Sequence, residues 1–161
     1  MKVDENLVLN SILNVPDGGL MIFDVDGDTH LGIKAVNPPY GPCLVTLSHP
    51  DYEGTPGLWA YRVASADLFA HLPNAVFRPT IQIDKIFFEK AIKPGYVVKS
   101  SDQLFLRIRT DRASFGYIDL ANGHFYETLP SRTSFQIARW KIVIEHKLYE
   151  DILFEFPKIS P

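Results

Sequence analysis

The sequence has little cysteine and no long apolar run. Cys43 is the only cysteine among 161 residues, so an internal disulfide cannot form. Because Cys43 lies in the apolar run 43–47, a buried structural thiol fits it better than a nucleophile, and a reducing compartment is implied. No basic segment followed by an apolar one opens the chain, and no apolar run approaches the roughly 20 residues of a membrane span. We therefore expect a soluble, cytoplasmic protein.

The sequence also lacks the common signatures of catalysis. It contains no Gly-x-Ser-x-Gly elbow, phosphate loop or dinucleotide fingerprint. None of its five histidines has the i, i+4 spacing or the short separations of zinc ligands, and His71 at the end of a predicted helix suits the helix dipole. These absences favour a protein without a cofactor and without enzymatic activity, and they leave the question of activity open.

The composition fits one globular domain over residues 1–161. Hydrophobic residues make up 46% of the chain and charged residues 22%, and no linker or low-complexity tract divides it. Charge is distributed unevenly: residues 1–60 carry two basic and eight acidic side chains, whereas the remainder carries 14 basic and 11 acidic ones. Such asymmetry favours a charged partner, and chance clustering of surface charge is the alternative.

The expected architecture is α+β: an antiparallel sheet or partly closed barrel with two or three short helices. Asp4 can cap a helix over residues 5–13, and Ser65 can cap a second one that ends at Leu72 before a proline. A third helix is expected over residues 84–90, where the aromatic content leaves a strand possible.

The second half of the chain predicts an antiparallel meander. Apolar and polar residues alternate over 103–109, 114–120 and 124–129, with turns at Asp111-Arg112 and Asn122-Gly123. Residues 136–145 and 152–156 predict two further strands. Thr133-x-x-Gln136 also resembles a helix capping box, and we favour the strand.

Three aspartates near residue 25 form the most conspicuous motif. An apolar run followed by Asp24-Val25-Asp26-Gly27 resembles the first motif of the haloacid-dehalogenase-like phosphatases over about six residues. In that family a threonine directly follows the glycine and a helix comes next; here Asp28 precedes Thr29, and residues 30–36 alternate like a strand. We therefore exclude membership of that family.

The same aspartates do not form a calcium loop either. With Asp24 as position one, an EF-hand needs glycine at position six and glutamate at position twelve, where this chain has Thr29 and Ala35. Asp26-Gly27 between two strands is instead typical of a β-hairpin turn, because glycine and aspartate tolerate positive φ. We expect a hairpin. The alternative is a divalent-metal-binding hydrolase using Asp24, Asp26 and Asp28, joined by His30 or His49.

A nucleic-acid surface has weak support. Phe105 lies among three arginines on one predicted stripe, which is the expected pattern, but three aspartates lie nearby and the net charge is −3. The arginines are Arg107, Arg109 and Arg112, and the aspartates are Asp102, Asp111 and Asp119. Nucleic-acid binding is therefore not expected.

The irregular segment 37–57 is the strongest candidate for a binding surface. Its two loops combine rigid prolines with Tyr40 and with the acidic group Asp51, Tyr52 and Glu53. Prolines lower the ordering cost of a loop, and tyrosine is a frequent binding anchor, although ordinary turns explain the same residues. We therefore expect a non-enzymatic protein-binding domain, such as an adaptor or the acidic inhibitor of a basic toxin.

Overall fold

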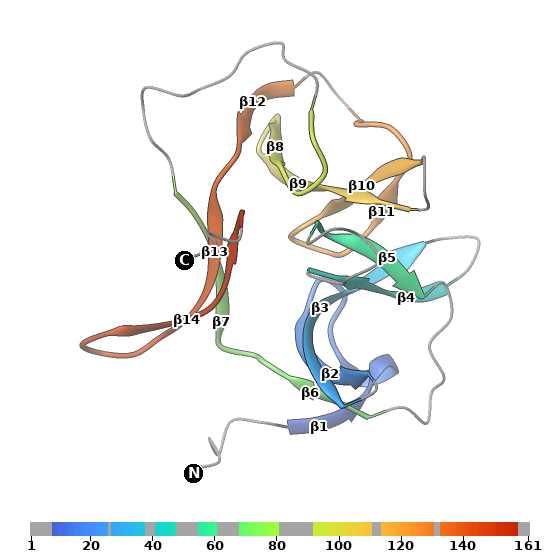
Figure 1. The fold of residues 1–161 in the computed structure, drawn as a ribbon. Helices are drawn as coiled ribbons and strands as arrows, with labels where there is room; N and C mark the ends of the chain where they lie inside the picture. The colour runs from blue at the N-terminus through green and yellow to red at the C-terminus, as the bar shows by residue number, and fades with distance from the viewer. Residues whose placement is uncertain are drawn as a thin grey trace.

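The computed structural model describes residues 8–25, 27–37, 41–47, 55–60, 68–80, 92–110, 114–130 and 133–157 of the chain. These residues form fourteen strands and one 3-10 helix, which follow one another in the order shown in Figure 1. The elements are β1 (Val8–Ser11), the 3-10 helix (Ile12–Asn14), β2 (Leu20–Val25), β3 (Asp28–Asn37), β4 (Gly41–Thr46), β5 (Gly57–Ala60), β6 (Leu68–His71), β7 (Ala75–Pro79), β8 (Val97–Ser100), β9 (Gln103–Arg109), β10 (Phe115–Asp119), β11 (Phe125–Tyr126), β12 (Thr133–Ile137), β13 (Trp140–Glu145) and β14 (Glu150–Phe156).

Eleven strands belong to one sheet and three to another. The large sheet runs β1-β6-β2-β3-β4-β5-β9-β10-β11, and β8 joins β9 to β12. The small sheet has β13 between β7 and β14. Neighbouring strands are antiparallel except where β5 meets β9 through the single parallel pair Gly57 and Arg109. The predicted antiparallel sheet is confirmed.

The large sheet curls until β11 returns to β3. Strands β3, β4, β5, β9, β10 and β11 pair in succession, and the N–H of Val36 in β3 donates to the carbonyl of Gly123 at 2.9 Å. Gly123 has a φ of +70°, and a Cβ there would lie 2.5 Å from the nitrogen of Gly18 and 2.6 Å from the carbonyl oxygen of Lys34. Only glycine therefore allows the chain at position 123, just before β11, to approach β3 and close the circuit that these paired strands form.

Two expected helices are wrong. Residues 8–11, inside the first expected helix, form β1, and Ser11 then caps only the three-residue 3-10 helix by accepting the N–H of Leu13. Residues 68–71, inside the second, form β6, which pairs with both β1 and β2. β6 has backbone partners on both sides and β1 on one, and this pairing outweighs the weak helix preference of a short segment. The third expected helix, 84–90, lies outside the described residues. The α+β assignment is thus corrected to a nearly all-β fold.

The hairpin and the meander are confirmed in position. Val25 lies opposite Asp28, and Gly27 has a φ of +89°, as a tight turn at Asp26-Gly27 requires, with Asp26 itself outside the described residues. Strands β9, β10 and β11 follow one another antiparallel, although β11 is shorter than expected. The turn at 111–113 lies outside the described residues. The turn that contains Asn122-Gly123 begins after Asp119. The buried carboxylate of Asp119 accepts a hydrogen bond from the backbone N–H of Ala121 in this turn.

The segment 136–145, expected to be one strand, is interrupted at 138–139. Its first part belongs to β12, which pairs with β8, and its second part is β13, which pairs with β7 and β14. The capping-box alternative is also wrong, because residues 133–137 are extended. The interruption carries the chain from one sheet to the other. The strand predicted at 152–156 is confirmed within β14.

One hydrophobic core joins the two sheets. Ile33, Val45, Leu106 and Ile118 of the large sheet belong to the same buried cluster as Trp140 of the small sheet. The indole N–H of Trp140 donates to the carbonyl of Gly95 at 2.7 Å. The inner face of the small sheet is therefore fixed against the body of the molecule.

Candidate functional site

The four residues predicted to bind a partner lie outside the described residues. Tyr40 belongs to the segment 38–40, which precedes β4 in the sequence. Asp51, Tyr52 and Glu53 belong to the segment 48–54, which lies between β4 and β5 in the sequence. Their binding role therefore stays a prediction.

The register of the β2–β3 hairpin separates two of the three aspartates. Directly opposite residues share a face, and successive residues alternate. Asp24 pairs with Thr29 and Asp28 with Val25, so the two carboxylates point to opposite faces of the hairpin. Asp24 instead accepts a hydrogen bond from the Thr29 hydroxyl at 2.8 Å. This geometry argues against one cation held by both.

The remaining residues of the metal hypothesis do not change this conclusion. His30 lies on the face opposite to Asp24 and packs on Phe23, with ring centroids 5.6 Å apart. Asp26 and His49 lie outside the described residues. Within the described residues, no three histidine, cysteine, aspartate or glutamate side chains are grouped so as to hold a metal ion.

The Cys43 thiol is buried in the main core. Burial raises its pKa to about 11, against a weaker lowering effect of a hydrogen bond from the Asn37 backbone. Since the thiolate is the nucleophilic form, a neutral buried thiol is unreactive at ordinary pH. The predicted structural role of Cys43 agrees with this environment.

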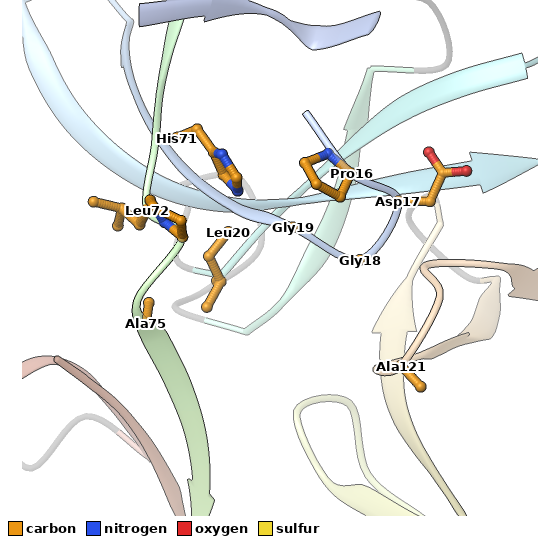
Figure 2. A pocket seen from close by; sticks show the side chains of 10 residues that line it. Pro16, Asp17, Gly18, Gly19, Leu20, His71, Leu72, Ala75 and Ala121 are labelled. Atoms are coloured by element: carbon orange, nitrogen blue, oxygen red, sulfur yellow. The ribbon is translucent and has the colours of Figure 1, made fainter. Parts of the chain in front are cut away.

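An open pocket of about 350 Å³ lies beside the loop that follows the 3-10 helix. It is lined by residues 16–20, by 71–73 with Ala75, and by Ala121. Figure 2 shows the His71 ring directed toward Gly19, whereas the Asp17 carboxylate points away on the other side of the loop. The two titratable side chains of the pocket therefore do not converge as an acid–base pair would. His71 ends a strand and not the predicted helix.

The Asp17 carboxylate has a structural partner in Lys34. The buried Lys34 ammonium lies 3.0 Å from Asp17 and donates to the carbonyl of Val15 at 2.6 Å. The backbone of Lys34 also pairs with Gly18 and Gly19. A buried cation needs such partners to offset its desolvation, so these groups fix the loop to β3.

Two arginines of the predicted basic stripe, Arg107 and Arg109, lie on one face of β9, whereas Arg112 lies outside the described residues. Their aromatic partners differ from the predicted one. Phe105 is fully buried beside Val98 and Tyr117 and cannot be the interleaved aromatic, because the outward face of β9 carries a small core of its own. The guanidinium carbon of Arg107 lies 5.0 Å from the Phe115 ring centroid and 5.4 Å from that of Tyr117. Arg107 also donates to the Tyr117 hydroxyl at 2.8 Å. Guanidinium groups of the chain itself thus occupy part of the aromatic surface that stacking bases would need.

The turn between β13 and β14 carries apolar side chains into solvent. Leu148 is 95% exposed, Tyr149 63% and, farther along β14, Ile152 55%. In Figure 1 this turn extends to the left, away from the rest of the ribbon. Sequence reasoning left residues 146–151 unassigned; the signal was an apolar pair, Leu148-Tyr149, between two strand-like segments.

A backbone hydrogen bond and two side-chain contacts connect the residues of this turn. The N–H of His146 donates to the carbonyl of Tyr149 at 2.9 Å, and the two rings stack with centroids 4.4 Å apart. His146 Nε2 also lies 3.0 Å from the Asp151 carboxylate. The exposed Leu148 therefore projects from a turn whose flanking residues contact one another.

The outer face of the small sheet combines an apolar row with an ionic network. Val76, Val143 and Ile152 lie side by side across β7, β13 and β14. Arg78 and Lys141 lie on one side of this row, and their partners Glu145 and Glu150 lie on the other. The ion pairs join Arg78 to both glutamates and Lys141 to Glu150. In this register, the long side chains that form the ion pairs extend across the apolar row. They cover Val143, which is fully buried although it lies on the outer face.

The network changes the titration of Glu150. A hydrogen bond from Lys141 lowers the pKa of Glu150, partial desolvation opposes this, and the charges of Arg78 and Lys141 add to the lowering. The glutamate therefore stays ionised on the mildly acidic side of neutrality.

Comparisons with protein-family models, curated proteins and solved structures found no match for this chain. In the part of the chain that the structure describes, no helix is long and apolar enough to cross a membrane.

Proposed function

We propose that this chain is a non-enzymatic protein-binding domain, of adaptor or toxin-inhibitor type, and that the turn between β13 and β14 is its docking element. The observation that carries the proposal is the exposure of Leu148, Tyr149 and Ile152 on one projecting hairpin. The acidic loops around Tyr40 and Tyr52 are retained as a second contact on the strength of their sequence alone.

The physical support is the cost of leaving these side chains in water. A buried leucine gains roughly 1.5–3 kcal/mol relative to an exposed one, and a cluster of exposed apolar side chains often marks an interaction site. The stacked His146 and Tyr149 rings order the turn before a partner arrives, which lowers the entropy cost of binding. Tyrosine is also over-represented among the residues that dominate binding energy.

Within the described residues, three groups that sequence and pocket suggest for chemistry are engaged in structural contacts, which supports a binding role. The Cys43 thiol is buried with a raised pKa, Lys34 neutralises Asp17, and Asp24 is hydrogen-bonded to Thr29. The hydrolase alternative needs Asp24 and Asp28 on one face, and the hairpin register places them on two.

Site-specific photo-crosslinking tests the proposal. A photoreactive phenylalanine analogue replaces Leu148 in the full chain expressed in its native host, and the adducts are separated by mass. We expect a discrete adduct that excess unmodified protein competes away. Competition should fail with the double variant Leu148→Ser and Ile152→Ser.

A matched control places the same analogue at Glu127, an exposed position next to β11 on the large sheet. It should give no adduct of the same mass. Equal labelling at both positions, or no labelling from Leu148, would contradict the docking role of the hairpin.

A further inference from the structure

The turn between β10 and β11 contains the one Asn-Gly pair of the sequence, Asn122-Gly123. Asparagine before glycine is especially prone to deamidation, because glycine has no side chain to shield the backbone nitrogen that reacts. This nitrogen gives its proton to a base in the solvent and attacks the side-chain carbonyl carbon of the asparagine. The new C–N bond closes a succinimide ring, and the side-chain nitrogen leaves as ammonia. Water then opens the ring to aspartate or to isoaspartate, in which the main chain runs through the former side chain.

Both reacting groups of this pair are engaged in the folded chain. The N–H of Gly123 donates to the carbonyl of Asp119 at 2.8 Å. The side-chain oxygen of Asn122 accepts the N–H of His124 at 2.9 Å. Gly123 is also buried, which shields its N–H from a base in the solvent. Ring closure therefore requires the turn to open first, as hydrogen exchange of a buried amide does.

The same turn closes the circuit of the large sheet. The carbonyl of Gly123 accepts the N–H of Val36 in β3 at 2.9 Å. Gly18 packs against the turn so closely that a Cβ on it would lie 3.2 Å from the nitrogen of Gly123. Gly18 is itself fixed to β3, because its N–H donates to the carbonyl of Lys34 at 2.9 Å. The contacts that close the circuit therefore also cover the nitrogen that deamidation needs.

We propose that Asn122 is a deamidation site whose rate is set by closure of the large sheet, and that its conversion to isoaspartate prevents the sheet from closing again. Isoaspartate lengthens the main chain by one carbon atom directly before Gly123. No space is left there, since even a Cβ on Gly123 would lie 2.5 Å from the nitrogen of Gly18. Aspartate keeps the length of the main chain and an oxygen that can accept the N–H of His124. The isoaspartate product is thus the one that opens the circuit, and this switch is independent of the docking hairpin.

Peptide mapping by mass spectrometry of the full chain, incubated at mildly alkaline pH, tests the rate. A synthetic peptide of residues 117–127 gives the rate of the unprotected pair in each buffer. Relative to this peptide, Asn122 in the native chain should deamidate at least about tenfold more slowly, because two hydrogen bonds must break first. In unfolding concentrations of urea the chain and the peptide should react alike. The variant Asn122→Ala confirms which peptide carries the mass change.

Two glycine variants test whether closure sets the rate. Gly18→Ala and Gly27→Ala both put alanine at a positive φ, of +81° and +89°. Only the first places a Cβ against the nitrogen of Gly123, whereas at Gly27 a Cβ meets no atom within 4 Å. Gly18→Ala should therefore deamidate faster than the parent in native buffer, and Gly27→Ala should match the parent. Circular dichroism shows that both are folded. If Gly18→Ala does not fold, urea below the unfolding transition replaces it: the deamidation rate of the parent should rise in parallel with hydrogen exchange of the Gly123 amide.

Hydrogen exchange at Val36 tests the consequence of the modification. The isoaspartate form is made in urea, separated from the aspartate form and refolded. It should lose protection of the Val36 amide, whereas Asn122→Asp should retain it and refold like the parent. Deamidation at equal rates in the native chain and the peptide, or equal acceleration in both glycine variants, overturns control by closure. An isoaspartate form with a protected Val36 amide overturns the switch, and so does an Asn122→Asp chain that loses this protection as well.

Discussion

In both the large sheet and the small sheet, successive side chains of a strand point to opposite faces, but the two sheets differ in what covers those faces. In the closed circuit of the large sheet, Leu106, Ile108 and Ile118 are fully buried in the common core. In the small sheet, Trp140 and Ile142 are equally buried on the inner face, whereas Ile152 remains exposed on the outer face. One face of the small sheet therefore belongs to the core, whereas the other keeps Ile152 in solvent.

This difference implies that stability and binding can be altered separately. Substitutions on the inner face should loosen the attachment of the small sheet to the body. Substitutions at the hairpin turn should leave the fold intact, because Leu148 has almost no buried area to lose. The comparison can be tested in four steps of decreasing effect on stability.

Trp140→Ala should have the largest effect. Its ring lies 5.2 Å from Phe77, 5.3 Å from Phe154 and 5.5 Å from Phe156 by centroid distance. Removing this side chain leaves a cavity and an unpaired carbonyl at Gly95, so we expect a loss of about 3–5 kcal/mol in the free energy of unfolding by urea. Trp140→Phe retains much of the packing and should lose less. A loss under about 1 kcal/mol for the alanine variant would mean that the two sheets do not share a core.

Gly123→Ala should have the next largest effect, with Gly27→Ala as its matched control. Both glycines have positive φ, which costs an alanine roughly 1–2 kcal/mol. A Cβ at Gly27 meets no atom within 4 Å, whereas at Gly123 it meets the backbone of Gly18 and Lys34. The variant at Gly123 should therefore be the less stable of the two in urea unfolding. Equal losses would argue that β3 and β11 do not close the circuit.

Glu150→Gln should destabilise the small sheet in a pH-dependent way. Because the pKa of Glu150 is lowered in the folded protein, its contribution is fully present above the ordinary glutamate value of 4.5 and is lost as pH falls through the folded value. The stability difference between parent and variant should thus be constant near neutrality and shrink below pH 4.5. Urea unfolding across this range measures it. A difference that persists at the acid end would mean that the lost contact is not ionic.

Local sequence signals predicted the elements whose partners are adjacent in the chain. The β2–β3 hairpin and the β9–β10–β11 meander are fixed by short turns, so their pattern and turn residues suffice. β1 and β6 could not be found in this way, because each is stabilised by a partner about sixty residues away. A short segment with weak helical preference becomes a strand when such a distant partner supplies its hydrogen bonds.

The candidate site was harder to predict for a related reason. Exposure of Leu148 depends on where the whole hairpin lies relative to the core, and an apolar residue in a sequence is read by default as buried. The aspartates illustrate the opposite difficulty. Asp24 and Asp28 look like one cluster in the sequence, but the pairing of Asp24 with Thr29 assigns them to opposite faces.

Leu148→Ser should have the smallest effect on stability and the largest on binding. The side chain is almost fully exposed in the free protein, so the free energy of unfolding should change by less than about 0.5 kcal/mol. A leucine buried only in the complex should instead contribute roughly 1.5–3 kcal/mol to partner binding, a loss of about tenfold or more in affinity. Leu106→Ser, at a fully buried leucine of β9, is the matched change and should destabilise the fold strongly. If Leu148→Ser instead destabilises the free protein as much as Leu106→Ser does, the turn packs against the body in solution and is not the docking element.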